Sequence, residues 1–236
     1  MIKAVFFDWT GTLSHSEPDG CELLHQVAQA LGVELPPQGL IKGLHAAENQ
    51  MPSGAPIRWR EGKDEEPFIR WWEILLAEVG VKLSRELMLE ITRRLSQVAR
   101  NLTWVLYDDV LPTMKILKQR GLILGLISNL PMDSSAGISV SLEPYLDFVV
   151  TVEEVGVGKP EPPIFLAALE QAGVKASEAV YVGDQYQTDV VGARGVGITP
   201  ILIDRFELEP EVSDCPRIHS LTELAGLTLA GTFNQN

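Results

Sequence analysis

Asp8 is the first residue of the chain whose type and setting favour chemistry. It directly follows the apolar run 4–7, and Gly11 interrupts the pattern before Thr12. A short apolar run of this kind predicts a buried strand that ends in a turn. In an open parallel sheet the ligand crevice lies outside the carboxyl ends of the strands, so we expect Asp8 at its mouth. A carboxylate at that place can act as a nucleophile or as a metal ligand.

Polar side chains follow two further predicted strands and precede one predicted helix. The segments 122–127 and 179–182 are apolar, and each ends in small or polar residues. Because the carboxyl ends of parallel strands lie at one edge of a sheet, we expect the side chains that follow them to meet Asp8 there. The residues of this group are Ser128, Asn129, Lys159 in the loop Gly158-Lys159-Pro160, Asp184 and Asp189.

Each type of side chain in this group has a use in phosphoryl transfer. A carboxylate attacks phosphorus only when the repulsion between two anions is cancelled, and a hard divalent cation on oxygen ligands cancels it. Asp8 and Asp184 could share such a cation. Ser128 and Lys159 would then hold the phosphoryl oxygens while negative charge spreads over them. Each signal alone is also common in turns, and it is their occurrence at successive strand ends that favours one site.

The elements that would position these side chains fall into two groups. In the C-terminal half, strands alternate with helices, which is the signature of a parallel sheet covered on both faces. Segments 68–79 and 85–98 instead carry apolar residues at helical spacing, and the whole of 15–105 is expected to be helical. We therefore predict an α/β fold, with a doubly wound, parallel-sheet, Rossmann-like core domain formed by 1–14 and 106–236 and an inserted all-helical cap domain formed by 15–105. The expected strands are 4–7, 122–127, 148–151, 179–182 and 198–203, and the expected core helices are 112–120, 162–172 and 188–194.

The composition excludes several classes of partner. The chain has 236 residues, of which 45% are hydrophobic, and a formal net charge of −13. Such a charge repels phosphate backbones and anionic lipid surfaces, so we expect neither nucleic acid nor a membrane as a partner. Two cysteines do not make a disulfide framework or a zinc site, and no apolar stretch approaches transmembrane length. We expect a cytoplasmic protein, monomeric or homodimeric, with a small-molecule substrate.

The order of these motifs resembles the haloacid dehalogenase-like (HAD) hydrolase superfamily, in the branch with a helical cap inserted after the first strand. The resemblance spans nearly the whole chain. The first motif of that family, Asp-X-Asp-Gly-Thr, is matched by Asp8-Trp9-Thr10-Gly11-Thr12 except at its second Asp. The later motifs are matched by Ser128, by Lys159 before Pro160, and by Asp184 and Asp189 in Gly183-Asp184-Gln185-Tyr186-Gln187-Thr188-Asp189.

The resemblance implies a role for each matched residue. Asp8 would be the nucleophile that forms an aspartyl-phosphate. The groups that bind or orient Mg²⁺ would be Asp8, the main-chain carbonyl of Thr10, Asp184 and Asp189, of which Asp189 would orient metal-bound water or Lys159. The groups that bind the phosphoryl oxygens would be Ser128, its neighbour Asn129, and Lys159. The resemblance therefore implies a magnesium-dependent phosphatase that acts on a small phosphorylated metabolite.

Thr10 departs from the pattern of the phosphatases in this superfamily, which have their general acid and base at this place. P-type ion pumps also have threonine here, in the pattern Asp-Lys-Thr-Gly-Thr. Three alternatives stay open. One is a 2-haloacid dehalogenase, whose members also lack the second Asp but need no metal. Another is a phosphonate carbon–phosphorus hydrolase, for which Trp9 and Lys42 are the matching features, and the third is a binding or regulatory module that has lost turnover.

Substrate specificity is expected to lie in the loops of the cap domain, which would cover the crevice and exclude water. The segment 58–63 combines basic and aromatic side chains in an otherwise acidic chain. Such a cluster suits an anionic or ring-bearing part of a substrate. We therefore predict Arg58 and Arg60 as substrate contacts.

Overall fold

The computed structural model describes residues 1–51, 64–99, 102–130 and 142–227. The chain divides into two compact units. The core unit comprises Met1–His15 and Trp104–Asn236, and the helical unit comprises Ser16–Thr103. The chain passes from one unit to the other within β2 (Ser14–Glu17) and at the start of β3 (Thr103–Leu106), and these two strands pair as a small sheet of their own.

The core unit is built on a six-stranded sheet in the order β5-β4-β1-β6-β7-β8, and every neighbouring pair of strands is parallel. The strand that begins the chain lies in the middle, where Phe7 is in register with Leu126 on one side and Val182 on the other. This arrangement confirms the predicted doubly wound α/β core. The strands are β1 (Ala4–Phe7), β4 (Ile123–Ser128), β5 (Phe148–Thr151), β6 (Ala179–Gly183), β7 (Thr199–Ile203) and β8 (Arg217–Ile218).

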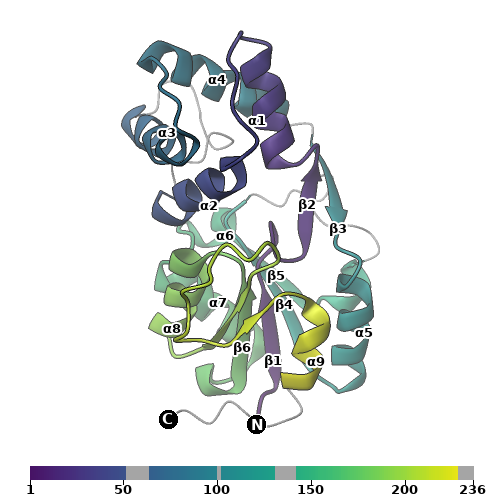
Figure 1. The fold of residues 1–236 in the computed structure, drawn as a ribbon. Coiled ribbons are helices and arrows are strands. Elements are labelled where there is room, and N and C mark those ends of the chain that lie inside the picture. The colour runs from purple at the N-terminus through teal and green to yellow at the C-terminus, as the bar shows by residue number, and fades with distance from the viewer. Residues whose placement is uncertain (52–63, 100–101, 131–141, 228–236) are drawn as a thin grey trace. The chain divides into compact units, whose positions relative to one another are not determined.

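Helices cover both faces of this sheet, which is why its strands are continuous apolar runs. Because successive side chains of a strand point to opposite faces, Val5 and Phe7 join one hydrophobic cluster while Ala4 and Phe6 join another. Figure 1 shows the helices of these two clusters on opposite sides of the sheet. They are α5 (Val110–Gln119) and α9 (Leu224–Leu227) on the first face, and α7 (Pro162–Ala172) and α8 (Gly192–Gly195) on the second. The remaining short elements are α6 (Val152–Val155) and 3₁₀ turns at Glu143–Tyr145, Ala176–Glu178 and Leu221–Glu223.

The helical unit contains α1 (Gly20–Gln29), α2 (Leu40–Gln50), α3 (Glu66–Val79) and α4 (Arg85–Val98). Its hydrophobic cluster includes Trp71 and Trp72, both fully buried. The indole N–H of Trp72 donates to the Thr92 hydroxyl at 2.8 Å, so the polar end of this side chain has a partner inside the cluster. Among the described residues, no helix has the length and hydrophobicity needed to cross a membrane.

Three local predictions were wrong. The range 15–105 was expected to be all-helical, but it contains most of β2 and most of β3. Each of these strands has only four residues, which is too short to show a reliable hydrophobic period. The strand β8, which has only two residues, lies beyond the expected last strand. The segment expected to be one α-helix at 188–194 is a π-helix (Tyr186–Val191) that leads into α8, and such wider turns often lie at functional sites.

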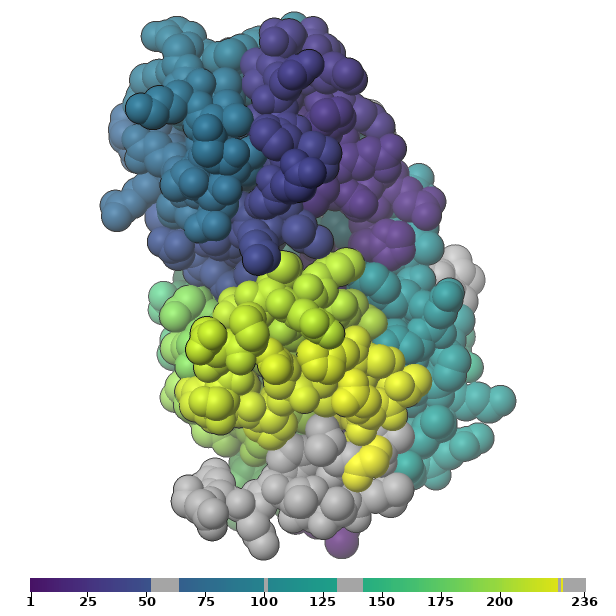
Figure 2. Space-filling view, viewed as in Figure 1, coloured from purple at the N-terminus to yellow at the C-terminus, as the bar shows by residue number. Residues whose placement is uncertain are grey.

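The segment that follows β7 is held in place by charged side chains. The Asp204 carboxylate accepts hydrogen bonds from the backbone N–H groups of Leu208 and Glu209, and the Asp214 carboxylate accepts one from Arg194. Figure 2 shows this part of the chain, coloured yellow-green, as an outer surface of the core unit. These contacts tie the segment to itself and to α8, although only two of its residues form a strand.

Candidate active site

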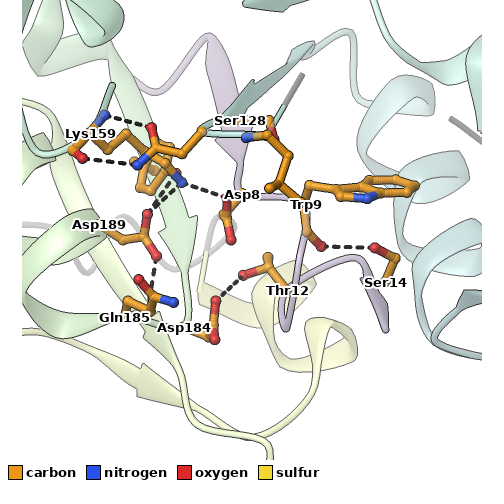
Figure 3. Close-up of polar contacts among 12 residues, drawn as sticks. Asp8, Trp9, Thr12, Ser14, Ser128, Lys159, Asp184, Gln185 and Asp189 are labelled. Carbon is orange, nitrogen blue, oxygen red and sulfur yellow. Dashed lines mark hydrogen bonds and ion pairs between the residues drawn. The ribbon is translucent and has the colours of Figure 1, made fainter. Parts of the chain in front are cut away.

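Three adjacent strands deliver polar side chains to one edge of the sheet (Figure 3). Asp8 directly follows β1, Ser128 is the last residue of β4, and Asp184 directly follows β6. Because β1 lies between β4 and β6 and all three run parallel, their carboxyl ends are neighbours. The loop before α7 adds Lys159 to the same place.

The carboxylates of Asp8, Asp184 and Asp189 form an acidic cluster in which one oxygen of each lies within 4.8 Å of the others. Asp8 is 8% exposed and Asp189 only 1%, so little water screens the repulsion between them. Three carboxylates and the single ammonium of Lys159 leave a formal excess of two negative charges. An all-oxygen donor set with this charge suits a hard divalent cation such as Mg²⁺.

Lys159 is buried, and its ammonium group is fully hydrogen-bonded. The Nζ atom donates to Asp8 Oδ1 at 2.5 Å, to the Tyr181 hydroxyl at 2.8 Å and to Asp189 Oδ1 at 2.8 Å. An ammonium has three protons, so each of them is directed at one acceptor. Lys159 therefore holds one fixed orientation beside Asp8.

Burial and charge together shift the pKa values of this pair. Burial raises the pKa of Asp8 from 3.8 to about 6, although the Lys159 ammonium beside it acts in the opposite direction. Burial also lowers the pKa of Lys159, but the carboxylates of Asp189 and Asp8 outweigh that effect and raise it overall. Lys159 is therefore a permanent cation at the site, and it is not a proton donor at neutral pH.

The loop Trp9–Ser14 curls back on itself directly after Asp8. The Trp9 carbonyl accepts hydrogen bonds from the backbone N–H groups of Leu13 and Ser14, both at 2.9 Å. Gly11 has a φ of +78°, and a Cβ atom there would lie only 2.3 Å from Asp184 Oδ2. Only glycine fits this position, and its absence of a side chain lets Asp184 approach the loop, where the Thr12 hydroxyl donates to Asp184 Oδ1 at 3.3 Å.

Comparison with known proteins identifies the family. The family model described as haloacid dehalogenase-like hydrolase matches residues 2–197. The chain belongs to this family. It is 30% identical to the glyceraldehyde 3-phosphate phosphatase of Methanopyrus kandleri, over 91% of this chain and 90% of that protein. It is also 30% identical to haloacid dehalogenase-like hydrolase domain-containing protein 3 of Homo sapiens, over 96% of this chain and 92% of that protein.

Solved structures of HAD hydrolases have the same fold. A HAD phosphatase from Thermococcus onnurineus is 28% identical, with a TM-score of 0.55, and the match covers 98% of this chain and 99% of that chain. A 2-haloacid dehalogenase from Pseudomonas syringae pv. Tomato is 26% identical, with a TM-score of 0.56, over 97% and 99% of the two chains. The fold is thus shared with hydrolases of two different chemistries.

The two residues that follow Asp8 in the HAD motif lie in different environments. Trp9 is 1% exposed and belongs to the hydrophobic cluster of the core unit, with its ring centroid 6.2 Å from that of Trp104. Figure 3 shows its indole directed away from Asp8. Thr10 is exposed and forms an isolated bridge with Ser14. Trp9 therefore packs under the loop, and Thr10 is the residue that presents its side chain to solvent.

Ser128 and Asn129 have different surroundings, although both were predicted to contact the phosphoryl group. The Ser128 hydroxyl is 1% exposed and accepts from the backbone N–H of Leu130 at 3.1 Å. The Asn129 amide is engaged at both ends with the backbone of Lys159: its Oδ1 accepts from the N–H at 2.6 Å and its Nδ2 donates to the carbonyl at 2.9 Å. Asn129 thus holds the lysine loop, and Gly158 makes room for it because a Cβ there would lie 2.5 Å from Asn129 Oδ1.

Sequence reasoning missed Tyr181. Its hydroxyl accepts from Lys159 Nζ and donates to Asp189 Oδ1 at 2.9 Å, while Asp189 Oδ2 accepts from the backbone N–H of Gln185 at 3.0 Å. Burial raises the pKa of Tyr181 well above its ordinary value, so the phenol stays protonated and remains a donor. The only signal in the sequence was the hydroxyl of Tyr181 itself, which is the one polar side-chain group in the otherwise apolar strand β6.

Of the three residues in the helical unit that were predicted to serve a substrate, the structure describes only Lys42. Arg58 and Arg60 lie outside the described residues. Lys42, the residue that would serve a phosphonate hydrolase, is exposed on α2. The assignment of these side chains to a substrate therefore stays a prediction.

Proposed function

We propose that this HAD hydrolase is a magnesium-dependent phosphatase that acts on a small phosphorylated metabolite through an aspartyl-phosphate on Asp8. The observation that carries the proposal is the pairing of Asp8 with the fully hydrogen-bonded Lys159 inside a cluster of three carboxylates. A phosphatase needs the cation that such a cluster would hold. The names of two relatives, the phosphatases of Methanopyrus kandleri and Thermococcus onnurineus, support the same choice.

In the first step, an oxygen of Asp8 forms a bond to phosphorus while the bond from phosphorus to the leaving oxygen breaks. The leaving oxygen departs with the electron pair and takes a proton from water. Lys159 keeps one N–H directed at Asp8, so this proton can turn to a phosphoryl oxygen once the carboxylate has become an ester. The hydroxyl of Ser128, at the end of β4 beside β1, would donate to a second phosphoryl oxygen.

In the second step, water attacks phosphorus and loses a proton to bulk water while the bond from phosphorus to Asp8 breaks. This releases phosphate and restores the carboxylate. Asp8 and Asp184, with the carbonyl of Thr10, would hold Mg²⁺, and Asp189 would orient Lys159 and metal-bound water. When bound, the cation would neutralise the two charges in excess at the site and polarise a phosphoryl oxygen. Asp189 suits a positioning role because its two oxygens already accept from Lys159, Tyr181 and Gln185.

The dehalogenase alternative has one observation in its favour, the similarity to a solved 2-haloacid dehalogenase. A dehalogenase needs no metal, however, and would leave three clustered carboxylates with one ammonium to balance them. The phosphonate alternative depended on Trp9 and Lys42, of which Trp9 is buried in the hydrophobic cluster and Lys42 is exposed on α2. The acidic cluster is the observation that favours the phosphatase over the dehalogenase.

The test compares wild-type protein with Asp8→Asn on acetyl phosphate and p-nitrophenyl phosphate. Phosphate release should require Mg²⁺, stop with EDTA, and be absent in the variant. Beryllium trifluoride, which mimics a phosphoryl group on a carboxylate, should bind the wild-type protein in the presence of Mg²⁺ and should not bind Asp8→Asn.

Controls separate the alternatives. Halide release from a 2-haloacid in EDTA, with no phosphate release in Mg²⁺, would establish the dehalogenase instead. Absence of every turnover together with normal binding of Mg²⁺ and beryllium trifluoride would indicate a binding module of the same fold.

A further inference from the structure

Arg205 lies in the segment after β7, beyond residue 197, where the match to the HAD family model ends. Its side chain is only 10% exposed. The two terminal nitrogens of its guanidinium form a fork on Asp109, with distances of 2.9 and 3.0 Å to the two carboxylate oxygens. The guanidinium also lies 3.9 Å from the centre of the Tyr107 ring. A planar cation held by a fork and a stacked ring has a fixed direction.

One terminal nitrogen of Arg205 also donates to the main-chain carbonyl of Thr12 at 2.7 Å. This contact joins residues 193 positions apart in the chain. Thr12 is fully buried, so its carbonyl needs a partner within the protein. Arg205 supplies that partner to the loop that carries the nucleophile.

The other loop carbonyls that accept hydrogen bonds do so from backbone N–H groups, and the Trp9 carbonyl also accepts from the loop's own Ser14 hydroxyl at 3.2 Å. The Trp9 carbonyl accepts from Leu13 and Ser14, the Ser14 carbonyl accepts from Gly11, and the Leu13 carbonyl accepts from the N–H of Tyr107 at 3.1 Å. Arg205 thus adds a side-chain contact from outside the loop to the middle of the loop. On its other side, the same residue Thr12 donates its hydroxyl to Asp184.

We propose that Arg205 is a positioning residue for the metal site: it fixes Thr12, and through Thr12 it fixes the separation of Asp8 and Asp184. The inference rests on the proposed function only in taking these two carboxylates as the metal ligands. A lysine could reach one acceptor but could not fork on Asp109 and bind Thr12 in one plane. The expected consequence of losing Arg205 is a weaker affinity for Mg²⁺.

Asp109 offers a matched control within the same ion pair. Its carboxylate also accepts from the Ser220 hydroxyl at 2.8 Å and from the backbone N–H of Leu221 at 2.9 Å. Unlike the guanidinium of Arg205, the carboxylate of Asp109 cannot donate a hydrogen bond to a carbonyl of the loop Trp9–Ser14. Replacing either residue breaks the ion pair, but only the replacement of Arg205 removes the partner of the Thr12 carbonyl.

The experiment measures Mg²⁺ binding by calorimetry for wild-type protein, Arg205→Met, Arg205→Lys and Asp109→Asn, each shown to be folded by circular dichroism. Loss of a group that orients metal ligands typically weakens metal affinity by roughly 10- to 100-fold, and we expect this of Arg205→Met. Arg205→Lys should bind with intermediate affinity. Asp109→Asn should bind within about threefold of the wild type, since the loop keeps its partner, even though it unfolds at a lower denaturant concentration.

Two results would overturn the inference. One is unchanged Mg²⁺ affinity in Arg205→Met or, if that variant does not fold, in Arg205→Lys. The other is equal weakening in Asp109→Asn, which would make the ion pair itself responsible. Wild-type protein that binds Mg²⁺ but releases no phosphate would count against the phosphatase alone, and the comparison of variants would still decide the role of Arg205.

Discussion

Replacement of Asp8 by Asn should stabilise the protein in the absence of metal at neutral and alkaline pH. Burial raises the pKa of the Asp8 carboxyl from 3.8 to about 6, in spite of its contact with Lys159. A carboxyl whose pKa is higher in the folded than in the unfolded protein stabilises the fold while it is protonated. This contribution is fully present below pH 3.8 and is lost as the pH rises through about 6. Asparagine is neutral at every pH and has nearly the same size, so the variant should not show this loss.

The pKa difference sets the magnitude. The rise in the pKa of Asp8 from 3.8 to about 6 corresponds to about 3 kcal/mol in the free energy of unfolding. We expect the advantage of Asp8→Asn to be small near pH 4 and to reach its full size above pH 7. The sign follows from burial. The free-energy cost of removing the Asp8 carboxylate from water is larger than the gain from its contact with Lys159.

Denaturant unfolding of both proteins in EDTA, followed by circular dichroism between pH 4 and pH 8, measures this difference. Asp108→Asn is the matched control, because Asp108 is exposed and its replacement removes the same charge from a chain of net charge −13. Mg²⁺ should reverse the order of stability, since only the wild type keeps both ligands. An advantage that does not change with pH, or a variant less stable than the wild type at pH 8 in EDTA, would refute the reasoning.

Three further predictions concern residues around the site. Tyr181→Phe should lower kcat about tenfold by removing one hydrogen-bond acceptor of Lys159, whereas Tyr145→Phe, the same deletion at another tyrosine, should leave kcat unchanged in steady-state assays. Thr10→Asp should raise the turnover of alkyl phosphates at least as much as that of aryl phosphates, because a positioned acid typically contributes about 10²- to 10⁴-fold and threonine supplies none; equal or lower rates on both would show that proton transfer does not depend on this position. Burial raises the pKa of Asp109, but hydrogen bonds from Arg205 and its neighbours outweigh this and lower it, so the stability that Asp109 contributes is present above pH 3.8 and lost as the pH falls further. Acid unfolding of Asp109→Asn should therefore depend less on pH than that of the wild type.

The sheet and its helices could be predicted where the signals were long or strongly punctuated. Helix α7 begins at two prolines and ends at Gly173 in the left-handed region, and its predicted bounds, 162–172, agree with the structure. Strands β1 and β5 have the predicted bounds for a similar reason, since each is a continuous apolar run. The two-residue strand β8 carries no periodic signal, and it forms only because its backbone completes the edge of β7.

The acidic cluster could also be predicted, because neighbouring parallel strands must bring Asp8 and Asp184 to the same edge. The contacts of Tyr181 and Arg205 could not. Tyr181 resembles one more large residue of a buried strand, and only its reach across the sheet face brings the hydroxyl to Lys159. Arg205 lies in a segment without regular structure, whose path depends on how it packs after β7.

The central place of β1 has a consequence for how the protein is made. Strand β1 pairs with β4 and β6, each more than a hundred residues later in the chain, so its partners do not exist when β1 is synthesised. Contacts this distant in sequence form late, because a long loop must close before they are gained, whereas the helices of the helical unit pack mostly on near neighbours. Strand β1 has no partner in this sheet until β4 has been translated, and its second edge stays unpaired until β6 follows. Its short length, four residues, limits the surface that it offers for aggregation during that interval.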